Sequence, residues 1–120
     1  MGEDFEQWLL LADLSISKLT GKRGECPAVY ALRNGETGET LKFGHTGCLR
    51  TRIFGNYLAG FGGGTTQRIH KQLLYDNMID CVEVSWIVTA DSVEAEHREK
   101  QFRKAYKATH GKRPIWDLTD

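Results

Sequence analysis

Hydrolysis of a phosphodiester bond needs a base for the attacking water, a cation for the pentavalent phosphate and a Lewis acid. This 120-residue sequence holds side chains of each kind. Arg52 is permanently charged and can grip phosphate oxygens through two N–H groups. Glu99 can hold one Mg²⁺ (or Mn²⁺), because Mg²⁺ keeps several waters and usually takes one or two carboxylates. We expect the metal to stabilise the leaving oxygen.

Tyr30 and Lys42 are the candidates for activating the water. A tyrosine is a poor base at its usual pKa of about 10. The period of two along strands puts Lys42 on the same face of a hairpin as Tyr30, where an ammonium group could lower the pKa of the phenol by favouring phenolate. We expect Tyr30 to activate water, directly or through Lys42. Lys42 could equally orient the water or touch the phosphate.

Each of these residues has a plainer interpretation when it is taken alone. Tyr30 would be a strand residue that packs on a helix. Arg52 would be a solvated helix residue. Glu99 precedes Arg103 by four positions, the spacing of an ion pair on a helix surface. Their joint occurrence in one order favours chemistry over these separate structural roles.

The predicted strands lie around a turn and near the end of the chain. Residues 28–32 form a short apolar run, and residues 41–44 form a second one. Asn34-Gly35 through Gly38 has turn chemistry, so the two runs predict a hairpin. Residues 81–88 alternate around Val82, Val84, Trp86 and Val88, which predicts a third strand.

Helical patterns fill most of the remaining chain. Residues 4–20 show helical spacing and predict an N-terminal helix before a linker. Leu49, Ile53 and Tyr57 form one buried stripe, with Arg52 and Asn56 on the next. Thr65 or Thr66 can cap another helix, which carries Ile69 and Leu73. Asp91-Ser92-Val93-Glu94 predicts a capping box for a helix ending near His110, before Gly111.

These elements predict an α+β fold with a small three-stranded, mainly antiparallel sheet flanked by helices, plus an extra N-terminal helix. We divide the chain into an N-terminal helix and linker (1–26) and a main domain (27–120).

In this order the motifs resemble the GIY-YIG nuclease superfamily. Ala28-Val29-Tyr30 stands where the family has its first tripeptide, and Lys42-Phe43-Gly44 stands for the second. The run through Thr46 is similar to the KIG-x-T form of some branches, and Arg52 follows Gly44 by eight positions. The resemblance covers about residues 27–117. It implies a stand-alone, metal-dependent DNA endonuclease with Tyr30, Lys42, Arg52 and Glu99 as catalytic residues.

The resemblance also guides the choice of metal ligand. Glu94, Glu96 and Glu99 all lie near the start of the last helix, and the family's apolar pattern around its acid fits Glu99 best and Glu96 second. The sequence departs from the family at Ala28, at Lys42 and at Asn56, where many members have histidine. Asp117 is the nearest counterpart of a late asparagine.

The charge is unevenly distributed although the net charge is zero. Residues 98–113 hold seven basic side chains and one acidic one, which is typical of a face that binds phosphate or of a solvated helix surface. We expect DNA as the partner, and the residues expected to contact it are His45, Arg50, Asn56, Arg103 and Lys104.

Several classes of protein are disfavoured. No run approaches the roughly twenty apolar residues of a membrane helix, and the N-terminus lacks the basic start of a signal peptide. Three widely spaced cysteines suit a reduced, cytoplasmic compartment. A catalytically inactive nucleic-acid-binding module and a protein–protein adaptor remain alternatives. The segment around Trp8 to Leu11 could pack on its own domain or pair two chains into a homodimer.

Overall fold

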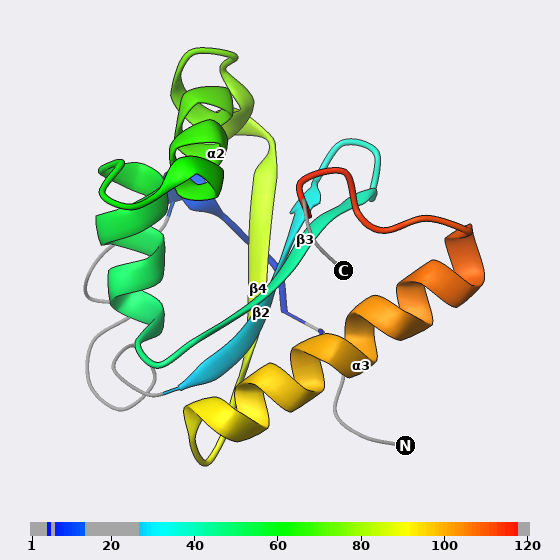
Figure 1. Cartoon of the computed structure of the whole chain (residues 1–120). Coiled ribbons are helices and arrows are strands. Elements are labelled where there is room, and N and C mark those ends of the chain that lie inside the picture. The colour runs from blue at the N-terminus through cyan, green and yellow to red at the C-terminus, as the bar shows by residue number, and fades with distance from the viewer. Residues whose placement is uncertain (1–4, 6, 14–26, 118–120) are drawn as a thin grey trace.

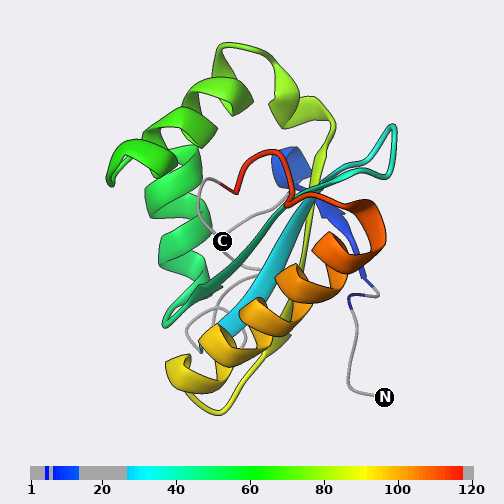
Figure 2. The ribbon, with the colours of Figure 1, turned by 45° about the vertical axis from the view of Figure 1, so that its right-hand side comes forward.

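The computed structural model describes Phe5 and residues 7–13 and 27–117. Its centre is a four-stranded antiparallel sheet with the order β1-β4-β2-β3. Figure 1 shows η3 and α2 on one side of this sheet and α3 on the other, and Figure 2 shows the same layers from a second direction. The strands are β1 (Leu9–Leu10), β2 (Ala28–Asn34), β3 (Thr40–Thr46) and β4 (Val82–Val88). The helices are η1 (Leu11–Asp13), η3 (Thr51–Leu58), α2 (Gly64–Leu74), η4 (Met78–Asp80) and α3 (Ser92–His110).

The predicted hairpin is confirmed. Tyr30 pairs with Gly44, and Leu32 pairs with Lys42. The Asn34 side chain accepts hydrogen bonds from the backbone N–H groups of Glu36 (2.8 Å) and Thr37 (3.2 Å), which closes the turn. β3 therefore forms one edge of the sheet, with β2 as its neighbour.

Two layers of side chains pack on the sheet. Tyr30 and Leu32 enter the main core with the predicted helix stripe of Leu49, Ile53 and Tyr57. On the α3 side, the ring of Phe43 stacks on Phe102 with 5.7 Å between centroids. The alternation of β2 and β3 thus separates a face that meets η3 and α2 from a face that meets α3.

The prediction of an N-terminal helix is wrong for Leu9–Leu10, which form a strand, and the sheet has four strands instead of three; Leu11–Asp13 form a single turn of 3-10 helix. Leu9 pairs with Val84 and Leu10 with Glu83, so this segment uses the backbone groups that β4 would otherwise expose as an edge. Leu11 is buried in the core. The described N-terminal segment therefore packs on its own domain. The rest of that predicted helix and the linker lie outside the described residues.

The last helix begins and ends where the sequence predicts. Asp91 Oδ1 accepts a hydrogen bond from Glu94 N at 2.8 Å, and Gly111 closes the helix with a φ of +76°. The chain then returns to the sheet, where Trp116 N donates to Leu41 O at 2.9 Å. That contact buries Trp116 and brings Asp117 beside β3.

Two general expectations concern the cysteines and the membrane. Cys48 and Cys81 are free thiols and half-buried. Within residues 5, 7–13 and 27–117, no helix combines the length and apolar character that crossing a membrane demands.

Candidate active site

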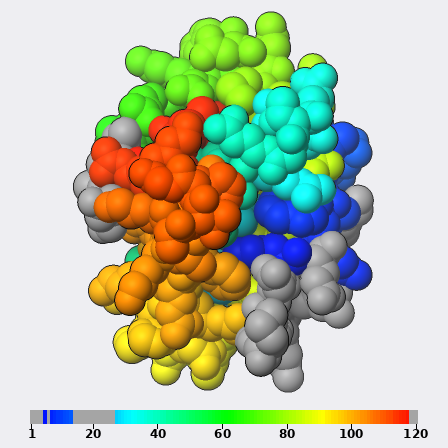
Figure 3. All heavy atoms as spheres, turned by 90° about the vertical axis from the view of Figure 1, so that its right-hand side faces the viewer, coloured from blue at the N-terminus to red at the C-terminus, as the bar shows by residue number. Residues whose placement is uncertain are grey.

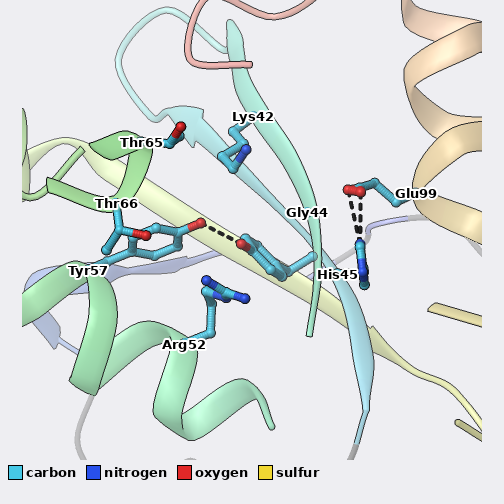
Figure 4. Close-up of a pocket in the computed structure, with 9 residues that line it drawn as sticks. Lys42, Gly44, His45, Arg52, Tyr57, Thr65, Thr66 and Glu99 are labelled. Atoms are coloured by element: carbon cyan, nitrogen blue, oxygen red, sulfur yellow. Dashed lines mark hydrogen bonds and ion pairs between the residues drawn. The ribbon is translucent and has the colours of Figure 1, made fainter. Parts of the chain in front are cut away.

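A pocket of about 250 Å³ lies around the edge strand β3. Figure 4 shows Tyr57 and Arg52 on one side of the strand and His45 with Glu99 on the other. The pocket therefore extends across both faces of the sheet edge and combines side chains from β2, β3, η3, α2 and α3. Its lining consists of Tyr30, Lys42, Gly44, His45, Arg52, Tyr57, Thr65, Thr66 and Glu99.

Arg52 is presented by η3, which is wound as a π-helix. Ala59 N donates to Phe54 O, five residues earlier, at 3.0 Å. The Nε atom of Arg52 is buried and has no hydrogen-bond partner within the described residues. A buried donor without a partner is rare, and the charge of a guanidinium makes an anion its natural complement.

The π winding also determines which neighbour of Arg52 reaches the pocket. In an α-helix, Asn56 at i+4 would lie closest to Arg52 along the axis. A π-helix closes its hydrogen bonds at i+5, and Tyr57 lines the pocket beside Arg52. The Asn56 side chain instead donates to Phe61 O and holds the following loop.

Tyr30 and Tyr57 form a buried pair joined by a hydrogen bond between their hydroxyls. Burial raises the pKa of the Tyr30 phenol well above its ordinary value; the charge of Tyr57 adds to the rise and that of Arg52 opposes it. Burial likewise raises the pKa of Tyr57. The expectation that Lys42 lowers the pKa of Tyr30 is therefore wrong, and the phenol is neutral near pH 7.

Lys42 is engaged by a carboxylate from the end of the chain. Its Nζ lies 2.9 Å from Asp117 Oδ1. Asp117 Oδ2 also accepts a hydrogen bond from Phe43 N at 3.3 Å and lies 3.8 Å from Arg103 Nε. The Asp117 side chain is 1% exposed. Asp117 therefore fixes where the Lys42 ammonium can lie.

Glu99 reaches the pocket from α3 and contacts His45. The Nδ1 atom of His45 lies 2.9 Å from Glu99 Oε1 and 3.3 Å from Oε2, as the dashed lines in Figure 4 mark. Glu99 is 7% exposed although it is an acid on a surface helix. Glu96, the second candidate for the metal ligand, is exposed and does not line the pocket.

The pocket can accommodate a divalent metal only as a site with few protein ligands. The described residues contain no group of three His, Cys, Asp or Glu side chains arranged around a common point. Glu99 is the pocket's acid, and its carboxylate has lone pairs beyond those facing His45. One carboxylate fits Mg²⁺, which fills its octahedron with water and substrate oxygens. Glu99 could therefore hold Mg²⁺ only with water and substrate oxygens as the other ligands.

The structure brings together some of the predicted site residues and leaves others apart. Tyr30, Lys42, His45, Arg52 and Glu99 line one pocket. Arg103 and Lys104 line a separate hollow of about 240 Å³ on α3, and Arg50 and Asn56 line neither.

Sequence reasoning missed four residues. Tyr57, Thr65 and Thr66 line the pocket, and Asp117 anchors Lys42. The threonines lie in the first turn of α2, after Gly63, which is its N-cap residue. The helical pattern assigns Tyr57 to the core stripe. Its hydroxyl is the one signal in the sequence for a polar role, because a buried tyrosine O–H usually finds a hydrogen-bond partner. Asp117 stands out in the sequence only as a substitute for asparagine.

No protein-family model matches this chain, and no curated protein matches it either.

Proposed function

We propose that this protein is a metal-dependent DNA endonuclease of the GIY-YIG type. The observation that carries the proposal is the buried Nε of Arg52, which has no hydrogen-bond partner among the described residues and lies in a pocket with two tyrosine hydroxyls, a lysine and a carboxylate. Such a pocket complements a phosphodiester group that must be held while water attacks it.

In this proposal Arg52 binds the non-bridging oxygens of the scissile phosphate. Its charge is worth most when negative charge builds on the pentavalent phosphorus, and burial of its Nε limits screening by water. Tyr30 activates water by orientation: its neutral phenol, held by Tyr57, hydrogen-bonds the water and directs a lone pair at the phosphorus. As the new O–P bond forms, a non-bridging oxygen of the phosphate takes the water's proton, and the P–O bond to the leaving oxygen breaks. Lys42 acts with Tyr30 by fixing the position of the water or of a phosphate oxygen, with Asp117 restraining its ammonium group.

The negative charge on the leaving oxygen would be stabilised on the other side of β3. Glu99 would hold Mg²⁺ or Mn²⁺, and the bound ion would supply positive charge for the leaving oxygen. His45 contacts Glu99 through Nδ1 and thereby fixes the carboxylate's orientation.

Cleavage of supercoiled plasmid tests this function. Purified protein with Mg²⁺ should nick the plasmid, and EDTA should abolish nicking. Arg52→Ala and Glu99→Gln should each lower the rate by about 100-fold or more, as removal of one group that stabilises the transition state commonly does. Arg68→Ala on α2 and Glu96→Gln on α3 are matched controls, because both side chains are exposed and absent from the pocket; both should cleave at the wild-type rate.

A catalytically inactive nucleic-acid-binding module is the second candidate. The observation that favours it is the ion pair between Lys42 and Asp117. Lys42 stands where the family has its second tyrosine, and this ion pair holds its ammonium group. Plasmid left intact with several metals and DNA substrates, combined with salt-sensitive DNA binding, would replace the endonuclease proposal by this one.

A further inference from the structure

A second hollow, of about 240 Å³, is lined by five lysine and arginine residues, whose aliphatic stems form most of its wall. Lys100, Arg103, Lys104 and Lys107 project from α3, and Arg113 comes from the segment after the helix. Figure 3 shows that α3 and this C-terminal segment lie side by side on one face of the molecule. The hollow has room for a phosphate group with part of its hydration, since one water takes about 30 Å³.

Two of these cations, Lys100 and Lys104, add no ion pair to the described part of the fold. The four helical cations follow the spacing i, i+3, i+4 and i+7, so they form a single row, and like charges four residues apart destabilise a helix. Lys100 and Lys104 are exposed, and neither has an ion pair with another residue in the described ranges. A bound polyanion would offset the repulsion.

The hollow adjoins the active-site pocket through Asp117. One oxygen of Asp117 lies 2.9 Å from Nζ of Lys42, which lines the pocket. The other lies 3.8 Å from Nε of Arg103, which lines the hollow. A single buried carboxylate thus contacts one lining residue of each site, so the two sites are neighbours.

The dimensions suit a phosphate backbone. The rise of an α-helix puts about 10 Å between Lys100 and Lys107. Successive phosphates of one strand are farther apart than the axial rise of about 3.4 Å, because the backbone winds around the duplex, so this row matches about two phosphates. We propose that the hollow is a second phosphate site, which holds the backbone of the DNA substrate at phosphates beyond the scissile one. This inference rests on the proposed function, since it takes DNA as the substrate.

The salt dependence of DNA binding tests the proposal. Binding of a fluorescent duplex to the full chain is followed by anisotropy in EDTA, which prevents metal-dependent cleavage, at several NaCl concentrations. The double variant Lys100→Gln/Lys104→Gln should bind more weakly at low salt, and its plot of log K against log[NaCl] should be shallower by about 0.9 for each phosphate that the variant no longer neutralises. Lys71→Gln, which removes an exposed charge from α2, is the matched control and should leave the slope unchanged.

The outcomes separate this inference from the nuclease proposal. If the double variant keeps the wild-type affinity and slope, or if the wild type binds no duplex, the second phosphate site is wrong, even where plasmid is cleaved. If the slope falls as expected but no DNA is cut, the phosphate site stands and the nuclease proposal fails. A third outcome concerns inorganic tripolyphosphate. If it raises the melting temperature of the wild type but not of the double variant, and the double variant binds duplex as the wild type does, the hollow binds a free polyphosphate and the DNA assignment is overturned.

Discussion

The ring of Tyr30 occupies the space that a side chain at Gly44 would need. The two residues pair across β2 and β3, and a Cβ atom at Gly44 would lie 2.8 Å from Tyr30 Cε1. Since real Cβ atoms almost never approach a ring carbon that closely, only glycine lets the phenol lie across the edge strand. This glycine lies on the strand between the two faces of the pocket, with Arg52 on one side and Glu99 on the other (Figure 4).

Gly44→Ala should displace Tyr30 and weaken both stability and cleavage. Because the Tyr30 ring is buried, the overpacking should lower the free energy of unfolding by about 1–3 kcal/mol. Urea unfolding measures this change. Gly47→Ala is the control, since nothing lies within 4 Å of a Cβ there, and it should change stability by less than about 0.5 kcal/mol. Equal effects of the two variants would contradict the packing argument.

The Lys42–Asp117 contact should behave as a buried ion pair. Asp117→Ala removes a side chain that is 1% exposed and leaves the largely buried Lys42 without its partner, so unfolding free energy should fall by about 3–5 kcal/mol. Lys42→Met leaves Asp117 with Phe43 N and the more distant Arg103, and should cost less. The double variant Lys42→Met/Asp117→Ala should lose less than the sum of the two single losses. Strict additivity in denaturant melts would show that the two side chains do not interact.

The neutral state of Tyr30 makes a prediction about the pH profile of cleavage. If the phenol orients water without losing its proton, Tyr30→Phe should lower the rate by about 10- to 100-fold and leave the shape of the profile between pH 7 and 9 unchanged. A phenolate base would behave differently: the wild-type rate would rise about tenfold per pH unit, because burial keeps its pKa above that range. A rise of that kind, absent in Tyr30→Phe, would restore the phenolate mechanism.

The hairpin and α3 could be predicted because their signals are local. Asn34 closes its own turn and Asp91 caps its own helix, so a few adjacent residues determine each boundary. β1 could not be predicted in this way. Leu9 and Leu10 fit a helical pattern equally well, and the reason they are extended is the free edge of β4, more than seventy residues away.

Some features of the candidate site could likewise be predicted from local patterns, and others could not. The face shared by Tyr30, Lys42 and Gly44 follows from strand alternation. The part played by Tyr57 depends on the π winding of η3, which no residue pattern in the helix announces. The ion pair of Lys42 with Asp117 forms because the chain returns to the sheet after α3. Trp116 N donates a hydrogen bond to Leu41 O there, which places the next residue, Asp117, beside Lys42. Interactions between residues so far apart in the chain are set by tertiary packing, so local sequence patterns do not reveal the state of Lys42.

Alkaline pH should destabilise the fold through the buried tyrosine pair. Burial raises the pKa values of Tyr30 and Tyr57 in the folded state above the value of about 10 in the unfolded chain. Above pH 10 the unfolded state therefore binds fewer protons than the folded state, and stability falls as pH rises toward the folded pKa values. Below pH 10 both states hold the protons, and the contribution is fully present. Each tyrosine should add a slope of up to about 1.4 kcal/mol per pH unit to the decline.

Urea melts at several pH values from 9 to 11.5 measure this decline, with fluorescence as the readout. Above pH 10, Tyr30→Phe should make the decline of unfolding free energy with pH shallower by the contribution of one tyrosine, up to about 1.4 kcal/mol per pH unit. This expectation holds whatever the variant's effect on stability at pH 8. Tyr75→Phe is the matched control: its ring is 78% exposed, so its hydroxyl is hydrated in both states and its loss should leave the slope as it is. A slope that survives in Tyr30→Phe unchanged would show that the phenol ionises equally easily in the folded and unfolded states. The orienting role proposed for Tyr30, which depends on a neutral, hydrogen-bonded tyrosine pair, would then be wrong.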